Sequence, residues 1–296
     1  MYERYYGLRE LPFRATTDPR FLLLMSPYAE ALSVLDEAVQ SRRGIVALVG
    51  ETGTGKTTIL RAFLASSPAT GVDALVLVDN PLLTRAEFIE TLALAFGLSV
   101  AAQTSKPKLL AELTHLLNAV HEKNGRAALV IDEAHTMSDE LLEEIRLLSN
   151  LENATARLLS VVLVGQPELG HRLNRPSLRQ LKQRVTLRAA LRRLEFTETA
   201  SYIAARLQVA GGDVTTIFTP DAIAAIHDAS HGLPRAISVI ADNALITGLA
   251  AGERPVGAGV VMEVCRDLDL DCGGDPPSDS EPMAVAGADT VRWMPS

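Results

Sequence analysis

Short apolar runs alternate with longer amphipathic stretches through the first two thirds of the chain. The runs have the length and the content of β-branched residues expected of buried strands, and they lie at 45–49, 74–78, 127–131, 160–164 and 185–187. The stretches between them, such as 57–65 and 105–123, repeat apolar residues at helical spacing. Short apolar strands separated by helices are typical of a parallel sheet covered on both faces. The pattern therefore predicts a three-layer α/β domain.

Local signals set the boundaries of several predicted helices. A helix over 29–43 stops at Gly44, and Thr84 with Glu87 fits a capping box before a helix that ends at Gly97. Near Leu194 the pattern becomes wholly helical. Thr197 is predicted to cap a helix that runs to Val209. Further helices are expected from Pro220 to about Ser230, from Pro234 to about Leu249 and, more weakly, over 260–268.

These patterns divide the chain into four parts. Residues 1–28 are predicted to form an extended arm that packs through Tyr5, Phe13 and Phe21. Residues 29–193 form the α/β core and residues 194–270 a small all-helical domain. Residues 271–296 are rich in Gly, Pro, Ser and acids, a composition that predicts a disordered acidic tail.

The most specific motif lies between the first strand and the helix after it. Gly50, Gly55 and Lys56–Thr57 fit G-x-x-x-x-G-K-[ST], the phosphate-binding P-loop. Glycines let backbone amides come close to a triphosphate, and the helix that begins near Lys56 directs its free N–H groups at the phosphates. A turn without a ligand is the alternative, which the flanking strand and helix disfavour. The predicted ATP-binding residues are Gly50, Glu51, Thr52, Gly53, Thr54, Gly55, Lys56, Thr57 and Thr58.

A second motif follows the third strand. The run 127–131 ends in Asp132 and Glu133, the Walker B pattern, and a carboxylate at the carboxyl end of a parallel strand faces the ligand crevice. We expect Asp132 and the Thr57 hydroxyl to bind Mg²⁺, and Glu133 to activate water. The distance between the motifs leaves room for another strand, which predicts a sheet of the inserted-strand type. Residues 132–135 also match the D-E-A-H signature of helicases, but those enzymes need a second P-loop domain that this sequence lacks.

Two further polar residues are placed where a hydrolytic site would use them. Gln166 follows the fourth strand and is expected to bind the γ-phosphate or the attacking water, unless it is an ordinary loop amide. Arg235 opens a helix of the second unit, where it could connect the two domains through the γ-phosphate or form a surface ion pair.

The segment 171–193 carries eight bases and no acid. Three interpretations remain open. Arg184 or Arg179 could project into the ATP site of a neighbouring subunit, the cluster could contact nucleic acid, or it could be a solvated face.

Charge and composition exclude several classes of protein. The net charge is −8, of which the seven acids and two bases of residues 265–296 account for −5, so no global field attracts nucleic acid. Cys265 and Cys272 make no disulfide framework, and the six histidines show no metal-ligand spacing. No apolar run approaches the roughly 20 residues of a membrane span, and no signal peptide is evident. We therefore expect a cytoplasmic protein without a membrane span.

Several motifs together resemble the AAA+ ATPases of the general secretion pathway protein A (ExeA) type, over roughly residues 2–250. They are the start Tyr2-Glu-Arg-Tyr-Tyr-Gly-Leu-Arg-Glu-Leu-Pro-Phe13, then Thr17-Asp-Pro-Arg-Phe21, the P-loop, Ile131-Asp-Glu-Ala-His135, Val164-Gly-Gln-Pro-Glu-Leu169, Leu178-Arg-Gln-Leu-Lys-Gln-Arg184 and Gly232-Leu-Pro-Arg235. The resemblance implies a P-loop NTPase (AAA+) core with an inserted strand and a helical lid. It also implies that Gln166 is sensor 1, Arg235 sensor 2 and Arg184 the arginine finger.

The family further implies a homo-oligomer, a ring or filament with ATP between subunits and a protein partner in an export or assembly complex. Secretion members continue into a membrane span and a peptidoglycan-binding domain, neither of which is found in these 296 residues. Related ATPases serve exopolysaccharide loci or act as DNA-bound transposition regulators of the MuB/TnsC type. The expected function is a Mg²⁺-dependent ATPase that drives assembly for secretion or export. The alternatives are a DNA-binding ATPase and a nucleotide-dependent scaffold with little turnover.

Overall fold

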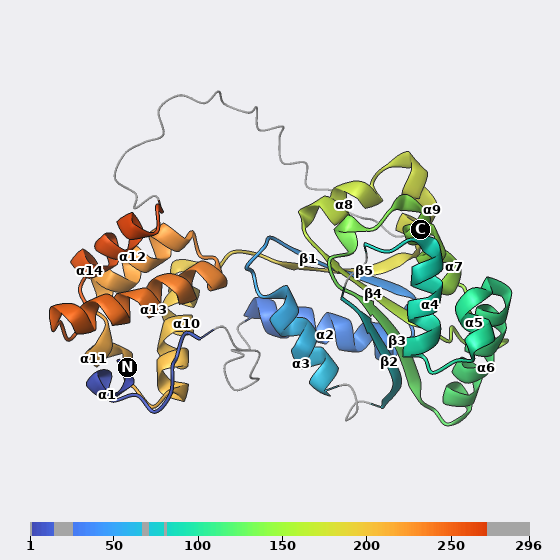
Figure 1. Ribbon diagram of the computed structural model, residues 1–296, viewed down its shortest axis with the longest axis horizontal. Helices are drawn as coiled ribbons and strands as arrows, with labels where there is room; N and C mark the ends of the chain where they lie inside the picture. The colour runs from blue at the N-terminus through green and yellow to red at the C-terminus, as the bar shows by residue number, and fades with distance from the viewer. Residues whose placement is uncertain (1, 15–25, 67–70, 80–81, 271–296) are drawn as a thin grey trace, which may run out of the picture.

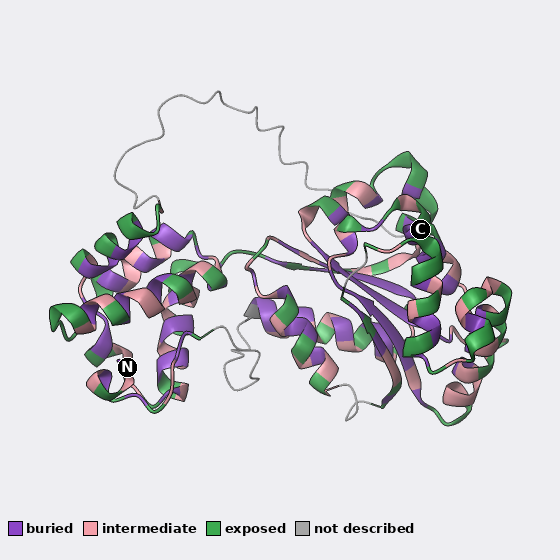
Figure 2. Cartoon of the chain, viewed as in Figure 1, coloured by how far each residue is buried: buried purple, intermediate pink, exposed green. Residues whose placement is uncertain are grey.

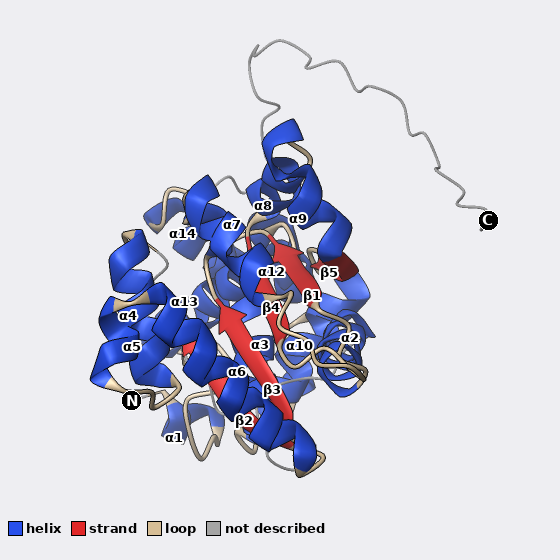
Figure 3. Ribbon diagram, turned by 90° about the vertical axis from the view of Figure 1, so that its right-hand side faces the viewer, coloured by secondary structure: helices blue, strands red, loops and turns tan. Residues whose placement is uncertain are grey.

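A five-stranded parallel sheet forms the centre of the larger of two structural units, with helices on both of its faces (Figures 1 and 3). The structure is a computed structural model that describes residues 2–14, 26–66, 71–79 and 82–270. The strand order is β2-β3-β4-β1-β5, and every pairing is parallel. The strands are β1 (Ile45–Gly50), β2 (Val72–Val78), β3 (Arg126–Ile131), β4 (Ser160–Gly165) and β5 (Val185–Leu191).

The position of each strand follows from its pattern of side chains. β3, β4 and β1 are almost wholly buried because both of their faces are covered, and their sequences are continuous apolar runs. β2 and β5 lie at the edges and mix exposed with buried positions. β4 lies between β1 and β3, which confirms the predicted inserted strand.

Alternate residues of the strands supply the two hydrophobic layers. Val46 and Leu48 point to the face covered by α2 (Ser26–Gln40) and α3 (Lys56–Ser66), whereas Ile45 points to the opposite face. The buried and exposed sides of the covering helices are visible in Figure 2. The helices of the core are α2 (Ser26–Gln40), α3 (Lys56–Ser66), α4 (Arg85–Ala95), α5 (Val100–Thr104), α6 (Lys106–Glu122), α7 (Asp139–Leu148), α8 (Pro167–Leu173) and α9 (Arg179–Arg184), with short 3₁₀ turns η3 (Ala134–Thr136) and η4 (Pro176–Leu178).

The second unit is a helical bundle that follows β5 and lies beside the sheet domain (Figure 1). It contains α10 (Phe196–Val209), α11 (Val214–Ile217), α12 (Pro220–Ser230), α13 (Pro234–Ala251) and α14 (Ala258–Asp267). α12 begins at Pro220 as predicted, and Thr219 caps it by accepting the Ala222 amide. We call this unit the lid. Among the described residues, no helix is long and apolar enough to cross a bilayer.

The N-terminal segment, residues 2–14, lies against the lid (Figure 1). Its first residues form a short helix, α1 (Glu3–Tyr6), where the sequence predicted an extended arm. The Arg9 amide donates to the Ala210 carbonyl at 2.8 Å, and Phe13 packs edge-on against Phe218. Phe13 is therefore buried as expected, and Tyr5 is half-buried. Phe21 and the tail 271–296 lie outside the described residues.

Some boundaries differ from the sequence prediction. α10 begins at Phe196, one residue before Thr197, because the Glu198 carboxylate turns back to accept the Glu195 amide at 2.8 Å and makes Glu195 the N-cap. β5 extends to Leu191, since an edge strand tolerates the exposed Arg188 that ended the apolar run. The short helices α5 and α11 were not predicted, because a helix of one turn has no measurable period.

Candidate nucleotide-binding site

The P-loop joins β1 to α3 at the carboxyl edge of the sheet. Gly53 and Gly55 have φ angles of 84° and 95°, a left-handed backbone that favours glycine. A Cβ on Gly55 would lie 3.2 Å from the hydroxyl of Tyr28. The Thr54 hydroxyl is buried inside the loop and donates to the Glu51 carbonyl at 2.8 Å. The loop is therefore a preformed cradle of backbone amides at the start of a helix.

Lys56 is the cation of this cradle. Its side chain is buried, and Nζ donates to the carbonyls of Gly50 and Glu51 at 2.8 and 2.9 Å. Burial lowers the pKa of Lys56, and the nearby carboxylates of Glu133 and Asp132 oppose that shift. The ammonium group thus lies across the loop, where a phosphate oxygen could replace either carbonyl as its acceptor.

Three contacts from outside the loop hold it in place. The buried Tyr28 hydroxyl, on α2, donates to the Thr54 carbonyl at 3.0 Å. The Arg235 amide, in the first turn of α13, donates to the Gly53 carbonyl at 3.2 Å. Arg193 makes a bidentate pair with Glu51, with Nη2 at 2.7 Å from Oε2. The core, the lid and the connection between them each contact the P-loop.

Asp132 and Glu133 follow the last residue of β3. Asp132 is buried, and its Oδ1 accepts the Glu133 amide at 2.8 Å. Burial raises the pKa of Asp132, while that amide, Lys56 and a hydrogen bond with the Thr57 hydroxyl oppose the rise. The two predicted Mg²⁺ ligands, Thr57 and Asp132, are therefore adjacent.

Glu133 adopts a left-handed backbone, with φ 51° and ψ 32°. For a residue with a side chain this conformation costs on the order of 1–2 kcal/mol, and such strain is concentrated at functional sites. The Glu133 carboxylate is partly exposed, and its Oε2 lies 3.3 Å from Nδ1 of His135, in an orientation that makes no hydrogen bond. His135 is thus a neighbour of the predicted catalytic carboxylate.

Gln166 emerges between the two motifs. It follows Gly165, the last residue of β4, which pairs with Val49 at the end of β1. β4 lies between β1 and β3 in the sheet. Gln166, which follows β4, therefore lies at the carboxyl edge of the sheet, between the P-loop and Asp132. Its backbone caps α8, but its side chain is not used in the cap. The side-chain amide of Gln166 therefore remains available for a ligand.

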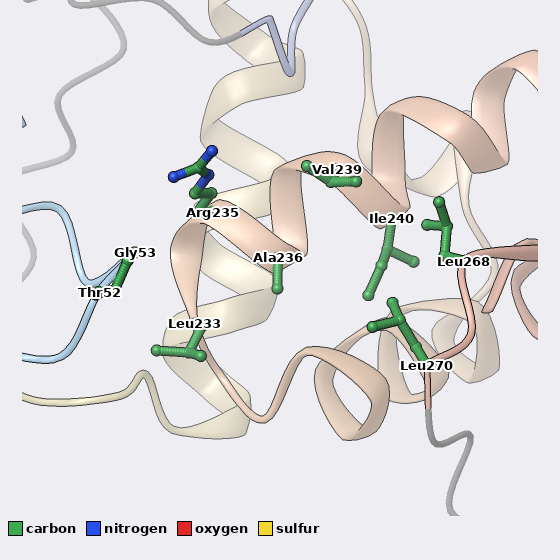
Figure 4. A pocket seen from close by; sticks show the side chains of 9 residues that line it. All are labelled: Thr52, Gly53, Leu233, Arg235, Ala236, Val239, Ile240, Leu268 and Leu270. Atoms are coloured by element: carbon green, nitrogen blue, oxygen red, sulfur yellow. The ribbon is translucent and has the colours of Figure 1, made fainter.

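Arg235 lies at the end of α13 that touches the P-loop. Its side chain is exposed, and the residue lies at the edge of an apolar groove (Figure 4). The groove has a volume of about 370 Å³. It is lined by Thr52, Gly53, Leu233, Arg235, Ala236, Val239, Ile240, Leu268 and Leu270.

The basic segment divides into two sets. Arg172 pairs with Asp139 at 2.6 Å, and Arg192 and Arg193 pair with Glu198 and Glu51 at 2.7 Å. The other five bases form no ion pair with a described residue, and all but the half-buried Arg184 are exposed. They are Arg175, Arg179, Lys182, Arg184 and Arg188.

The sheet register locates Arg184 far from its own P-loop. Arg184 precedes Val185, which pairs with Ile45 at the amino end of β1, whereas the P-loop follows the carboxyl end. A strand rises about 3.3 Å per residue, so the length of β1 separates the two by roughly 20 Å. Arg184 can therefore serve a nucleotide site only on another subunit.

The arrangement fits a Mg²⁺-bound nucleoside triphosphate. The loop offers amides and an ammonium group for the phosphates, and a carboxylate beside a hydroxyl is a donor set suited to Mg²⁺. The buried Asp132 has no arginine or lysine ion pair among the described residues, although its burial favours a cationic partner.

Sequence reasoning identified the Walker motifs but missed two residues of the site. Tyr28 belongs to no motif, and only the packing of α2 brings its hydroxyl to the P-loop. The pairing of Arg193 with Glu51 joins residues 142 positions apart. The run of bases drew attention to Arg193, but no pattern in the sequence indicates that Glu51 is its partner.

Comparison with known proteins agrees with this geometry. Residues 39–173 match the family described as AAA domain. The chain is 40% identical over 258 residues to general secretion pathway protein A of Aeromonas hydrophila, which covers 86% of this chain and 46% of that protein. The chain thus spans about half the length of that relative.

Solved structures share the fold. The ORC2 protein of Aeropyrum pernix, in ADPNP–ADP complexes, aligns with a TM-score of 0.64 at 16% identity, over 87% of this chain and 72% of that one. Cdc6p of Pyrobaculum aerophilum has a TM-score of 0.62 at 17% identity, over 84% and 70%. The RuvB Holliday junction branch migration motor of Thermotoga maritima has a TM-score of 0.57 at 18% identity, over 88% and 74%.

Residues 39–173 therefore belong to the AAA domain family, and the chain has the fold of AAA+ P-loop ATPases. Over most of its length the chain is similar to general secretion pathway protein A, which confirms the resemblance found in its motifs.

Proposed function

We propose that this protein is a Mg²⁺-dependent ATPase that acts as an oligomeric AAA+ assembly factor for envelope secretion or exopolysaccharide export. One observation supports the catalytic part above all others. A single edge of the sheet brings together the Lys56 cradle, the adjacent Thr57 and Asp132, and Glu133. We place the protein in the cytoplasm, because its substrate would be ATP.

Each residue has a role that its position supports. The loop amides and Lys56 would bind the phosphates, and Thr57 and Asp132 would hold Mg²⁺, whose charge would offset that of the phosphates. Glu133 accepts a proton from water, and Gln166 and Arg235 contact the γ-phosphate. Catalysis would come mainly from positioning and charge neutralisation.

Two substitutions separate binding from hydrolysis. Lys56→Ala should lose ATP binding, because it removes the ammonium group of the cradle. Glu133→Gln should still bind ATP but lose turnover by about 10²-fold or more. If Glu133→Gln changes neither binding nor a slow basal rate, the protein is a nucleotide-dependent scaffold rather than a hydrolase.

We further propose that ATP lies between subunits, with Arg184 as the arginine finger and Arg179 as the second candidate. The distance of Arg184 from its own P-loop supports action in trans. Lys56→Ala lacks a working ATP site but keeps Arg184. Arg184→Ala keeps its ATP site but lacks the arginine finger. Mixing the two inactive variants should restore activity on the order of a quarter to a half of the parent if fingers act in trans, with gains of about 10³ per site. Failure of the mixture, together with equal activity per site in dilute and concentrated parent protein, would reject the finger.

A DNA-binding ATPase is the second candidate, because five bases of the basic segment lack ion-pair partners among described residues. This function predicts ATP-dependent, salt-sensitive DNA binding that is lost when Arg175, Lys182 and Arg188 are changed to Glu. Absence of a gel shift at low salt removes this candidate. Neighbouring export or polysaccharide genes would support the first proposal, and a neighbouring transposase gene the second.

A further inference from the structure

A chain of hydrogen bonds connects the N-terminal segment to α13 through the lid. At its centre is Arg206, a buried guanidinium on α10 that donates on both sides. Its Nε donates to the Pro12 carbonyl at 2.7 Å, and Nη2 donates to the Arg14 carbonyl at 3.1 Å. The fork of this side chain thus holds two carbonyls, two residues apart, at the end of the N-terminal segment, which no motif connects to the lid.

The same guanidinium continues the chain on its other side. Nη1 donates to the Tyr202 hydroxyl at 2.5 Å, which lies 2.9 Å from the Ser238 hydroxyl. The Ser238 hydroxyl donates to the Pro234 carbonyl at 2.9 Å. Because that serine has one hydroxyl proton, Tyr202 must be the donor to Ser238. From Arg206 to Pro234 each donor therefore points toward α13, an arrangement in which each bond polarises the next.

The chain ends next to the P-loop. Pro234 is the first residue of α13, and the next amide, that of Arg235, donates to the Gly53 carbonyl at 3.2 Å. A peptide group is planar, so holding the Gly53 carbonyl also sets the orientation of the Gly53–Thr54 peptide in the loop. The side chain of Arg235 leaves the same turn of the helix (Figure 4).

We propose that Arg206 and Tyr202 are positioning residues that act through Ser238 to hold the first turn of α13, and with it Arg235, against the P-loop. This inference rests on the proposed nucleotide-binding function. It implies that attachment of residues 2–14 to the lid is coupled to nucleotide affinity. Neither side chain touches the nucleotide; both set the place of the residues that do.

The hydroxyl groups can be tested apart from packing. Tyr202→Phe keeps the buried ring, and Ser238→Ala removes one atom that faces Tyr202. Ser201→Ala is a matched control, since Ser201 lies on the same helix as Tyr202. Its hydroxyl donates to the Thr197 carbonyl four residues earlier, as the Ser238 hydroxyl does to Pro234, but it bonds to no tyrosine among the described residues. Arg206→Lys keeps the charge but cannot bind two carbonyls and a phenol in one plane.

Two readouts should change together. The KM for ATP should rise roughly threefold to tenfold in Tyr202→Phe and Ser238→Ala, the effect of losing one buried hydrogen bond, while kcat changes less than twofold. In nucleotide-free protein, hydrogen exchange at the Arg235 amide should accelerate several-fold. Ser201→Ala should change neither quantity, and Arg206→Lys should change both in the same direction.

The coupling to Arg235 gives the decisive comparison. In an Arg235→Ala background, Tyr202→Phe should raise the KM less than in the parent, because the part of its effect that the Arg235 side chain carries is already lost. The proposal is overturned if Tyr202→Phe and Ser238→Ala lower the melting temperature without changing KM or Arg235 exchange, or if their effects add fully to that of Arg235→Ala. If the parent protein binds no ATP, the proposed function fails. Hydrogen exchange at the Arg235 amide in the variants then still tests whether Arg206 and Tyr202 position the first turn of α13.

Discussion

Tyr28→Phe tests whether the P-loop is held in shape from outside. The Tyr28 hydroxyl is buried and donates to the Thr54 carbonyl at 3.0 Å. That carbonyl shares a peptide plane with the Gly55 amide, so the bond directs the amide toward the opposite side, into the phosphate cradle. Burial raises the pKa of Tyr28, which keeps the hydroxyl protonated as a donor.

The structure sets the size of the effect. Phenylalanine preserves the ring but leaves a buried carbonyl unpaired, which costs about 1–3 kcal/mol. If the loop shifts when the bond is lost, ATP affinity should fall by roughly 5- to 150-fold, because about 1.4 kcal/mol corresponds to a factor of ten. In the absence of nucleotide, the melting temperature should fall by roughly 2–12 °C, at about 2–4 °C per kcal/mol for a protein of this size.

Calorimetric titration with ATP and thermal unfolding without it provide the two measurements. Tyr5→Phe is the control, because Tyr5 is a half-buried ring that packs edge-on against Tyr6 and its hydroxyl bonds to none of the described residues. It should leave ATP affinity unchanged. An affinity within twofold of the parent in Tyr28→Phe, with a lowered melting temperature, would refute the claim that this hydroxyl shapes the cradle.

Three other substitutions make distinct predictions. Asp132→Asn should raise the melting temperature of the nucleotide-free protein at neutral pH while abolishing Mg²⁺-dependent turnover. Burial raises the pKa of Asp132 in the folded protein, so its ionisation opposes folding above that pKa. The gain in melting temperature should therefore disappear as the pH falls toward the pKa of Asp132 in the unfolded chain, and a gain that persists in acid contradicts this reasoning. Arg193→Gln should change stability by less than about 1 kcal/mol, since both partners of the Glu51 pair are about half exposed, and a stability loss well above that in chemical denaturation would show the pair to be stronger than its exposure implies. Gly232→Ala should lower stability by about 2 kcal/mol or more, because φ is 71° and a Cβ would lie 2.1 Å from the Leu194 carbonyl oxygen; unchanged thermal unfolding would mean that the junction between core and lid can shift.

The sequence by itself determined the local chemistry of the site. The spacing of Gly50, Gly55 and Lys56 specifies a loop whose amides converge, because Gly55 adopts a left-handed backbone that favours glycine and a Cβ on Gly50 would lie 2.9 Å from the Leu191 carbonyl oxygen. The apolar run before Asp132 placed a carboxylate at the end of a strand, and parallel strands bring their carboxyl ends to one edge. Periodicity located the long helices and the central strands for the same reason, since each is set by residues close together in the chain.

Only the tertiary structure decided which distant groups hold that site. Tyr28, Arg193 and the first turn of α13 contact the P-loop through single hydrogen bonds or ion pairs between elements far apart in sequence. Such contacts leave no periodic pattern, because one donor and one acceptor suffice. For the same reason, the sequence left the three interpretations of the basic segment open. Whether an arginine forms an ion pair depends on which acid the fold brings to it: Asp139 pairs with Arg172, but none of the described acids pairs with Arg184.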